Sequence, residues 1–124
     1  MVGGNETAFA QSELVLSIYA KSLRLMGPSG SGQLTKAVNQ ICIAGILQGL
    51  SEGLHFAEQA GLDIEAVVDV ISKGAAQSWQ MDNRSGTMAA GKFDYGFAVN
   101  WMRKDLAIVL DTADKIQASV PLTA

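Results

Sequence analysis

The chain has 124 residues, of which 48% are hydrophobic and 17% charged, and a formal net charge of −3. The Lys and Arg residues are scattered, which excludes the clustered positive charge that nucleic-acid binding requires. A single cysteine and a single histidine exclude an internal disulfide and indicate no metal site of the usual kind. The longest apolar run, residues 41–47, is too short for a bilayer, so the sequence indicates a cytoplasmic protein that has no membrane partner.

The chain is apolar for its size. Its mean hydropathy of +0.20 is high for a domain of 124 residues, because small domains have much surface for their volume. Either the chain builds an unusually rich core, or another domain or subunit covers part of its surface. The second interpretation predicts a homodimer or a higher homo-oligomer.

The first predicted elements are a helix and a short strand. Asn5 is a suitable N-cap for a helix of about residues 6–21. Residues 23–26, Leu-Arg-Leu-Met, alternate in a way that favours a strand, and a glycine-rich turn follows them.

A long second helix is expected from about Gly32 to Ala60, with Gly61 in the left-handed position after its end. At 100° per residue, one face of this helix carries Lys36, Gln40, Ile43, Leu47, Leu50 and Leu54, with Asn39 at its edge. Its middle is apolar on nearly every side, which is typical of a helix that is buried centrally. Three glycines spaced by four residues favour a close backbone approach by another helix: Gly45, Gly49 and Gly53.

Three further helices complete the prediction. Asp63 caps a helix of about residues 64–73, which Gly74 closes, and Ser78 caps one that runs to about Ala90. The last helix covers about residues 99–117, with an apolar stripe of Met102, Leu106, Val109, Ala113 and Ile116. Lys104 lies opposite this stripe and therefore points away from the domain's own core. The fold class is mainly α.

The turn before the second helix is the most informative segment of the sequence. Residues 27–36 read Gly-Pro-Ser-Gly-Ser-Gly-Gln-Leu-Thr-Lys. The N-terminal end of a helix is positive, so it disfavours a lysine and attracts carboxylates and phosphates. Lys36, with the amides of Asn39 and Gln40 on nearly the same face, is placed to meet an anionic ligand. From these residues alone, a plain loop followed by a solvated lysine stays open as the alternative.

This spacing resembles the signature Gly-x-x-Gly-x-Gly-x-x-x-Lys-x-x-Asn of the β-hydroxyacid dehydrogenase family, which includes 3-hydroxyisobutyrate dehydrogenase and, more distantly, 6-phosphogluconate dehydrogenase. Later segments follow in the family's order, at 61–63, 74–76, 93–97 and 102–106. The resemblance implies the helical domain of 6-phosphogluconate dehydrogenase-like enzymes at residues 27–124. Residues 1–26 would be a remnant helix and strand of the nucleotide-binding Rossmann domain, and the chain would be truncated at both ends.

The resemblance also implies roles for individual residues. Lys36 would be the general acid and base, with Gly32, Asn39 and Gln40 near the substrate. Lys104 and Phe97 would lie near the nicotinamide cofactor. The family often carries two consecutive asparagines where this chain has Asn39-Gln40. Position i+4 faces Lys36 best, which favours Gln40 as the partner of the lysine. The family pattern points to Asn39, so the choice between the two stays open.

The activity that the resemblance implies is NAD(P)-dependent hydride transfer between a small hydroxy acid and its semialdehyde. NAD or NADP is the expected cofactor, and the choice between them is normally set in the nucleotide-binding domain. No Gly-x-Gly-x-x-Gly segment for a dinucleotide occurs in the chain. The alternative hypothesis is a helical dimerisation module that has no catalytic activity of its own.

Overall fold

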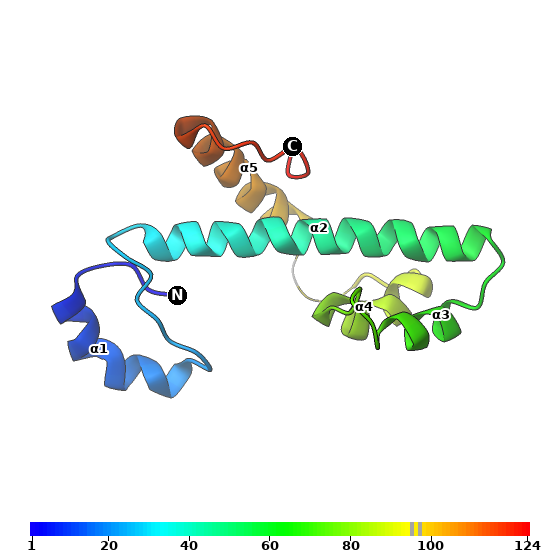
Figure 1. Ribbon diagram of the computed structural model, residues 1–124, viewed down its shortest axis with the longest axis horizontal. Coiled ribbons are helices and arrows are strands. Elements are labelled where there is room, and N and C mark those ends of the chain that lie inside the picture. The colour runs from blue at the N-terminus through cyan, green and yellow to red at the C-terminus, as the bar shows by residue number, and fades with distance from the viewer. Residues whose placement is uncertain (95, 97) are drawn as a thin grey trace.

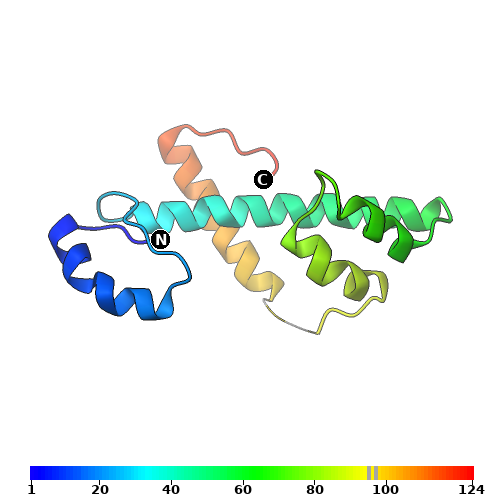
Figure 2. The ribbon, with the colours of Figure 1, turned by 60° about the horizontal axis from the view of Figure 1, so that its bottom comes forward.

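The computed structural model describes residues 1–94, 96 and 98–124, and these residues form a mainly helical fold, as predicted (Figure 1). The helices are α1 (Glu6–Tyr19), α2 (Ser31–Gln59), α3 (Ile64–Ile71), α4 (Trp79–Ala89) and α5 (Val99–Ile116). The long α2 forms the axis of the molecule (Figures 1 and 2). Both α3 and α4 pack along its C-terminal half, whereas α5 crosses it nearer its beginning. None of the described helices is long and apolar enough to span a membrane.

The N-terminal segment is less regular than predicted. Asn5 caps α1 by accepting a hydrogen bond from the Ala8 N–H at 3.1 Å, as expected. The prediction of a strand at 23–26 is wrong for the described residues, where Leu25 makes only an isolated parallel bridge to Val2. A lone pair of short strands is at best marginally stable, because each needs further neighbours to satisfy its backbone. Within the described part of the chain, α1 packs against no other helix.

The predicted face of α2 is the one that the chain buries. Gln40, Leu50, Leu54 and Ala57 are the buried residues of this helix, and Leu50 and Leu54 form the apolar core with Met81 of α4. Burial on all sides is not found within this chain. Leu34, Val38 and Phe56 are exposed, because α3, α4 and α5 together cover only part of the circumference.

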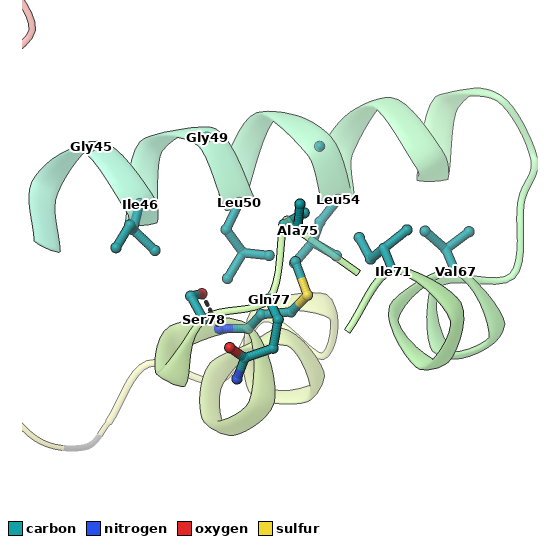
Figure 3. A pocket seen from close by; sticks show the side chains of 13 residues that line it. Gly45, Ile46, Gly49, Leu50, Leu54, Val67, Ile71, Ala75, Gln77 and Ser78 are labelled. Carbon is teal, nitrogen blue, oxygen red and sulfur yellow. Dashed lines mark hydrogen bonds between the residues drawn. The ribbon is translucent and has the colours of Figure 1, made fainter. Parts of the chain in front are cut away.

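The three glycines of α2 do not serve the close backbone approach that their spacing predicted. A Cβ on Gly45 would lie 2.8 Å from the Leu122 side chain, whereas Gly49 and Gly53 have nothing within 4 Å. They form one wall of an apolar cavity of about 410 Å³ between α2, α3 and α4. In Figure 3, Leu50 and Leu54 reach from α2 toward this cavity, and Ile71 closes it from α3. The missing side chains therefore leave open space.

The remaining helix ends follow local sequence signals. The Asp63 carboxylate accepts hydrogen bonds from two N–H groups at the start of α3, and the Ser78 hydroxyl accepts one from Met81 at the start of α4. α3 ends at Ile71, two residues before the predicted end at about residue 73. The N–H groups of Lys73 and Gly74 bond three residues back, which tightens the chain into a turn.

Large apolar side chains remain exposed on several elements. Leu14 and Ile18 on α1 are 80% and 75% exposed, and Val38 on α2 is 58% exposed. So many large exposed apolar side chains favour a cover by another domain or subunit.

We therefore expect the 124-residue chain to self-associate when it is isolated at micromolar concentration. Association removes exposed apolar surface from water, and each Å² so removed contributes about 25 cal/mol. Light scattering over a tenfold range of concentration measures the mass. A particle of 13.0 kDa at every concentration would contradict the expectation. It would show that the exposed apolar side chains do not require a second subunit to cover them.

Candidate active site

The glycine-rich turn places Lys36 in the second turn of α2. Gly30 precedes the helix in the left-handed region, with φ +96°, which a residue with a side chain rarely adopts. Gly32 lies in the first turn, where a Cβ would come within 3.1 Å of the Gly3 backbone nitrogen. Glycine at this position lets the N-terminal segment lie closely against the helix. A role of Gly32 toward a substrate stays a prediction.

Gln40, rather than Asn39, is the partner of Lys36. The Lys36 Nζ donates to the Gln40 Oε1 at 2.7 Å, one helical turn apart. Asn39 is exposed and donates to the same oxygen at 2.9 Å. The structure thus resolves the alternative that the spacing left open, since the i+4 residue faces the lysine and the i+3 residue meets only the amide.

The Gln40 side chain also bridges α2 to α5. It is only 3% exposed, and its Nε2 donates to the Asp105 Oδ2 at 2.8 Å. The Met102 sulfur lies 3.9 Å from the same nitrogen. A buried amide is stable only when its polar atoms are paired, and here both the oxygen and the nitrogen have partners.

Lys104 joins this cluster from the solvent side of α5. Its Nζ lies 2.9 Å from the Asp105 Oδ1, and its side chain is 57% exposed, as the helical phase predicted. The Nζ also lies 5.7 Å from the centre of the Trp101 ring, a cation–π distance. A continuous polar path therefore runs from Lys36 through Gln40 and Asp105 to Lys104. We call these four residues the lysine network.

Asp105 is the member of the network that sequence reasoning missed. Its carboxylate is 20% exposed and lies at the edge of the apolar stripe that begins at Met102. The hydrogen bond from Lys104 lowers the pKa of Asp105 most, burial opposes this, and the Gln40 hydrogen bond and the charges of Lys104 and Lys36 add to the lowering. A charged residue at the edge of an apolar stripe was the signal that could have found it.

The other predicted site residue, Phe97, lies outside the described residues. Among those that are described, no three His, Cys, Asp or Glu side chains come together in a way that could hold a metal ion. The lysine network presents two ammonium groups at the surface, and that of Lys36 lies near the positive end of α2. The amide behind it is buried and fully paired. Such an arrangement can donate a proton to an anionic ligand or take one back.

Comparison with known proteins finds the family that the residue spacing resembles. The family profile described as "NAD-binding of NADP-dependent 3-hydroxyisobutyrate dehydrogenase" matches residues 30–124. An uncharacterized oxidoreductase of Shewanella frigidimarina is 57% identical over all of this chain, which spans 43% of that protein. The 2-hydroxy-3-oxopropionate reductase of Escherichia coli is 33% identical, and the chain spans 42% of it.

A solved structure shares this fold. The 3-hydroxyisobutyrate dehydrogenase of Mycobacterium tuberculosis with L-serine superposes with a TM-score of 0.89 at 28% identity, over 99% of this chain and 45% of that one. The chain thus spans less than half the length of the relatives that it matches.

The lowered pKa of Asp105 predicts how the stability of the fold depends on pH. A carboxyl whose pKa is lowered on folding stabilises the protein at pH values above its unfolded pKa, and this contribution is lost as pH falls through the folded pKa. Asp105→Asn should therefore destabilise the protein at pH 6, and its difference from wild type should shrink below about pH 4. Urea denaturation followed by circular dichroism at pH 6, 4 and 3 measures this difference.

Asp114→Asn, an exposed carboxyl on the same helix, is the matched control. A difference for Asp105→Asn that stays constant over this pH range would show that the carboxylate charge does not stabilise the fold.

Proposed function

Because the chain belongs to the 3-hydroxyisobutyrate dehydrogenase family of oxidoreductases, we propose that it is the helical, lysine-bearing part of an NAD(P)-dependent β-hydroxyacid dehydrogenase. The reaction is reversible hydride transfer between a small hydroxy acid and the corresponding semialdehyde. The observation that carries the proposal is the lysine network, which unites the two lysines that the family resemblance marks, one on α2 and the other on α5.

Lys36 acts as the general acid and base. In the direction of reduction its Nζ gives a proton to the carbonyl oxygen of the substrate, and in oxidation the neutral amine takes the hydroxyl proton. The Gln40 Oε1, 2.7 Å away, holds the amine in place between these two states. The nicotinamide cofactor, when bound, supplies or accepts the hydride.

A small carboxylic acid fits the surroundings of Lys36. The start of α2 carries the positive end of the helix dipole, and its cap, Gly30, offers no side-chain oxygen to the first N–H groups. A carboxylate is the natural partner for such a helix end. The relatives agree in class, since one is named for 2-hydroxy-3-oxopropionate and the mycobacterial structure was solved with L-serine, which is itself a small hydroxy acid. Asn39 offers an exposed amide beside this site.

Lys104 fits a role toward the cofactor. Its ammonium is exposed, lies on the side of α5 away from the core, and is held by a single carboxylate oxygen. An exposed cation of this kind can meet a phosphate or the ribose–nicotinamide portion of NAD or NADP. The phosphates themselves need a glycine-rich dinucleotide loop, so we place the main cofactor site in a nucleotide-binding domain beyond this chain.

The N-terminal residues support this placement. Val2 and Leu25 pair in parallel, and α1 lies between them in the sequence. A parallel pair with a helix as its connection is the unit from which nucleotide-binding sheets are built. Residues 1–26 are accordingly proposed as the end of that domain. The protein would work in the cytoplasm as a homodimer or higher homo-oligomer.

The exposed apolar surface favours one alternative. Val38, Phe56 and Trp101 are exposed on two helices, so the chain could serve as a helical dimerisation module that has no chemistry of its own. The two functions differ in what Lys36 does, because a dimerisation module does not need a lysine that is bonded to a buried amide.

Lys36→Ala tests the catalytic role in the full-length enzyme. Removing a positioned acid–base group should lower kcat by about two to four orders of magnitude and leave cofactor affinity close to unchanged. Lys73→Ala is the control, because Lys73 lies in the turn after α3, pairs with Asp69 at 3.2 Å and is not part of the lysine network. If Lys36→Ala keeps more than about a tenth of kcat, general acid catalysis of this size is absent.

Lys104→Ala in the same enzyme should raise the KM for the cofactor more than it lowers kcat.

The placement of the cofactor site makes a separate prediction. The 124-residue chain alone should bind neither NAD nor NADP with a Kd tighter than about 10 μM, which corresponds to roughly 7 kcal/mol. Calorimetric titration with each nucleotide measures the affinity, and the full-length enzyme serves as the positive control. Tighter binding by the isolated chain would show that the main cofactor site lies within these residues.

A further inference from the structure

Asp105 is the point at which the two halves of the lysine network meet. Its two carboxylate oxygens have different partners: Oδ2 accepts from the Gln40 Nε2 at 2.8 Å, and Oδ1 lies 2.9 Å from the Lys104 Nζ. No direct bond joins Asp105 to Lys36 among the contacts that the described residues make, so any effect of this carboxylate on that amine passes through the amide or through space.

We propose that Asp105 is a positioning residue for the reaction, which fixes the Gln40 amide in one orientation and through that amide fixes the Lys36 amine. This inference rests on the proposed acid–base role of Lys36. It assigns to the buried pair of Gln40 and Asp105 the task of orienting the lysine, which is distinct from touching the substrate.

The contacts of Gln40 define its orientation. Its oxygen faces two donors, Lys36 and Asn39, and its nitrogen faces the carboxylate. Turning the amide over would direct the NH₂ group at the Lys36 ammonium and the carbonyl at the Asp105 carboxylate. Both of these contacts are repulsive, and a side chain that is 3% exposed cannot exchange them for water.

Lys36 needs such a fixed acceptor because nothing else in the described chain is bonded to its amine. The side chain is exposed and has a flexible four-carbon stem. A single strong acceptor at 2.7 Å therefore selects one arrangement from many. Since misplacement of a reacting group by about 1 Å can cost about 100-fold in rate, holding the acceptor in place has kinetic value.

The use of two separate oxygens lets the cofactor side change without disturbing the substrate side. Lys104 can leave Oδ1 for an anionic ligand, and the bond between Oδ2 and Gln40 is retained. The carboxylate belongs to α5 and the amide to α2, so the position of Lys36 depends on how these two helices pack.

The experiment is a double-mutant cycle on the full-length enzyme. We expect Asp105→Ala to lower kcat by about 10- to 100-fold in the wild-type background. In the Lys36→Ala background the same change should lower the remaining rate by less than about twofold, because a residue that acts through Lys36 has nothing left to position. A loss of equal size in both backgrounds would overturn the proposal, since it would mean that Asp105 supports the fold or acts on its own.

Two further variants keep the test decisive. Asp105→Asn retains the shape of the side chain and an oxygen for Gln40, so it guards against loss of the fold, and its kcat should lie between those of wild type and Asp105→Ala. Asp114→Asn should have no effect on kcat, as an exposed carboxyl on the same helix. Wild-type kcat in Asp105→Ala beside an inactive Lys36→Ala overturns only the positioning role. Wild-type kcat in Lys36→Ala overturns the proposed function and the positioning role together.

Discussion

The buried amide of Gln40 is the contact on which the candidate site depends. It accepts from an exposed lysine on its own helix and donates to a carboxylate on α5, so one side chain connects the surface chemistry to the packing of two helices. Its burial makes the arrangement costly to lose, because an amide without partners in the interior costs more than its hydrogen bonds contribute to stability. The exposed lysine thereby acquires a fixed position that its own side chain could not give it.

The length of α2 separates this site from the apolar core. At 1.5 Å per residue, its 29 residues span roughly 40 Å. Lys36 and Gln40 lie in its first three turns, whereas Leu50 and Leu54 pack with Met81 of α4 toward its other end. A single helix therefore joins a polar end, which carries the candidate site, to an end that packs in the apolar core. The residue that we propose as the general acid and base, Lys36, thus lies on a regular element and not on a loop, which favours a constant geometry.

The surfaces that this chain leaves exposed fit the place that we propose for it in a larger enzyme. The chain spans 43% of the Shewanella relative and 45% of the mycobacterial structure, and it exposes apolar side chains on α1, α2 and α5. The Lys104 side chain, at one end of the lysine network, is also exposed. In the proposed enzyme, the nucleotide-binding domain would cover part of this surface and bring the cofactor to the lysines.

Much of the local structure followed from the sequence by itself. The caps at Asn5, Asp63 and Ser78 and the helix end at Gly61 were predictable, because each depends on residues within one or two turns. The helical phase also determined that Lys36 and Gln40 share a face and that Lys104 points away from the core. The family was recognisable for the same reason, since its signature is a spacing of residues along a turn and a helix.

Only the tertiary structure decided which of these residues meet. Asp105 pairs with Gln40 across 65 positions of sequence, and no local pattern specifies which carboxylate reaches a buried amide. The open cavity beside Gly49 and Gly53 and the single bridge in place of a strand at 23–26 likewise depended on which elements lie alongside. Periodicity and caps are properties of one segment, whereas pairing and burial arise only when segments distant in sequence pack together.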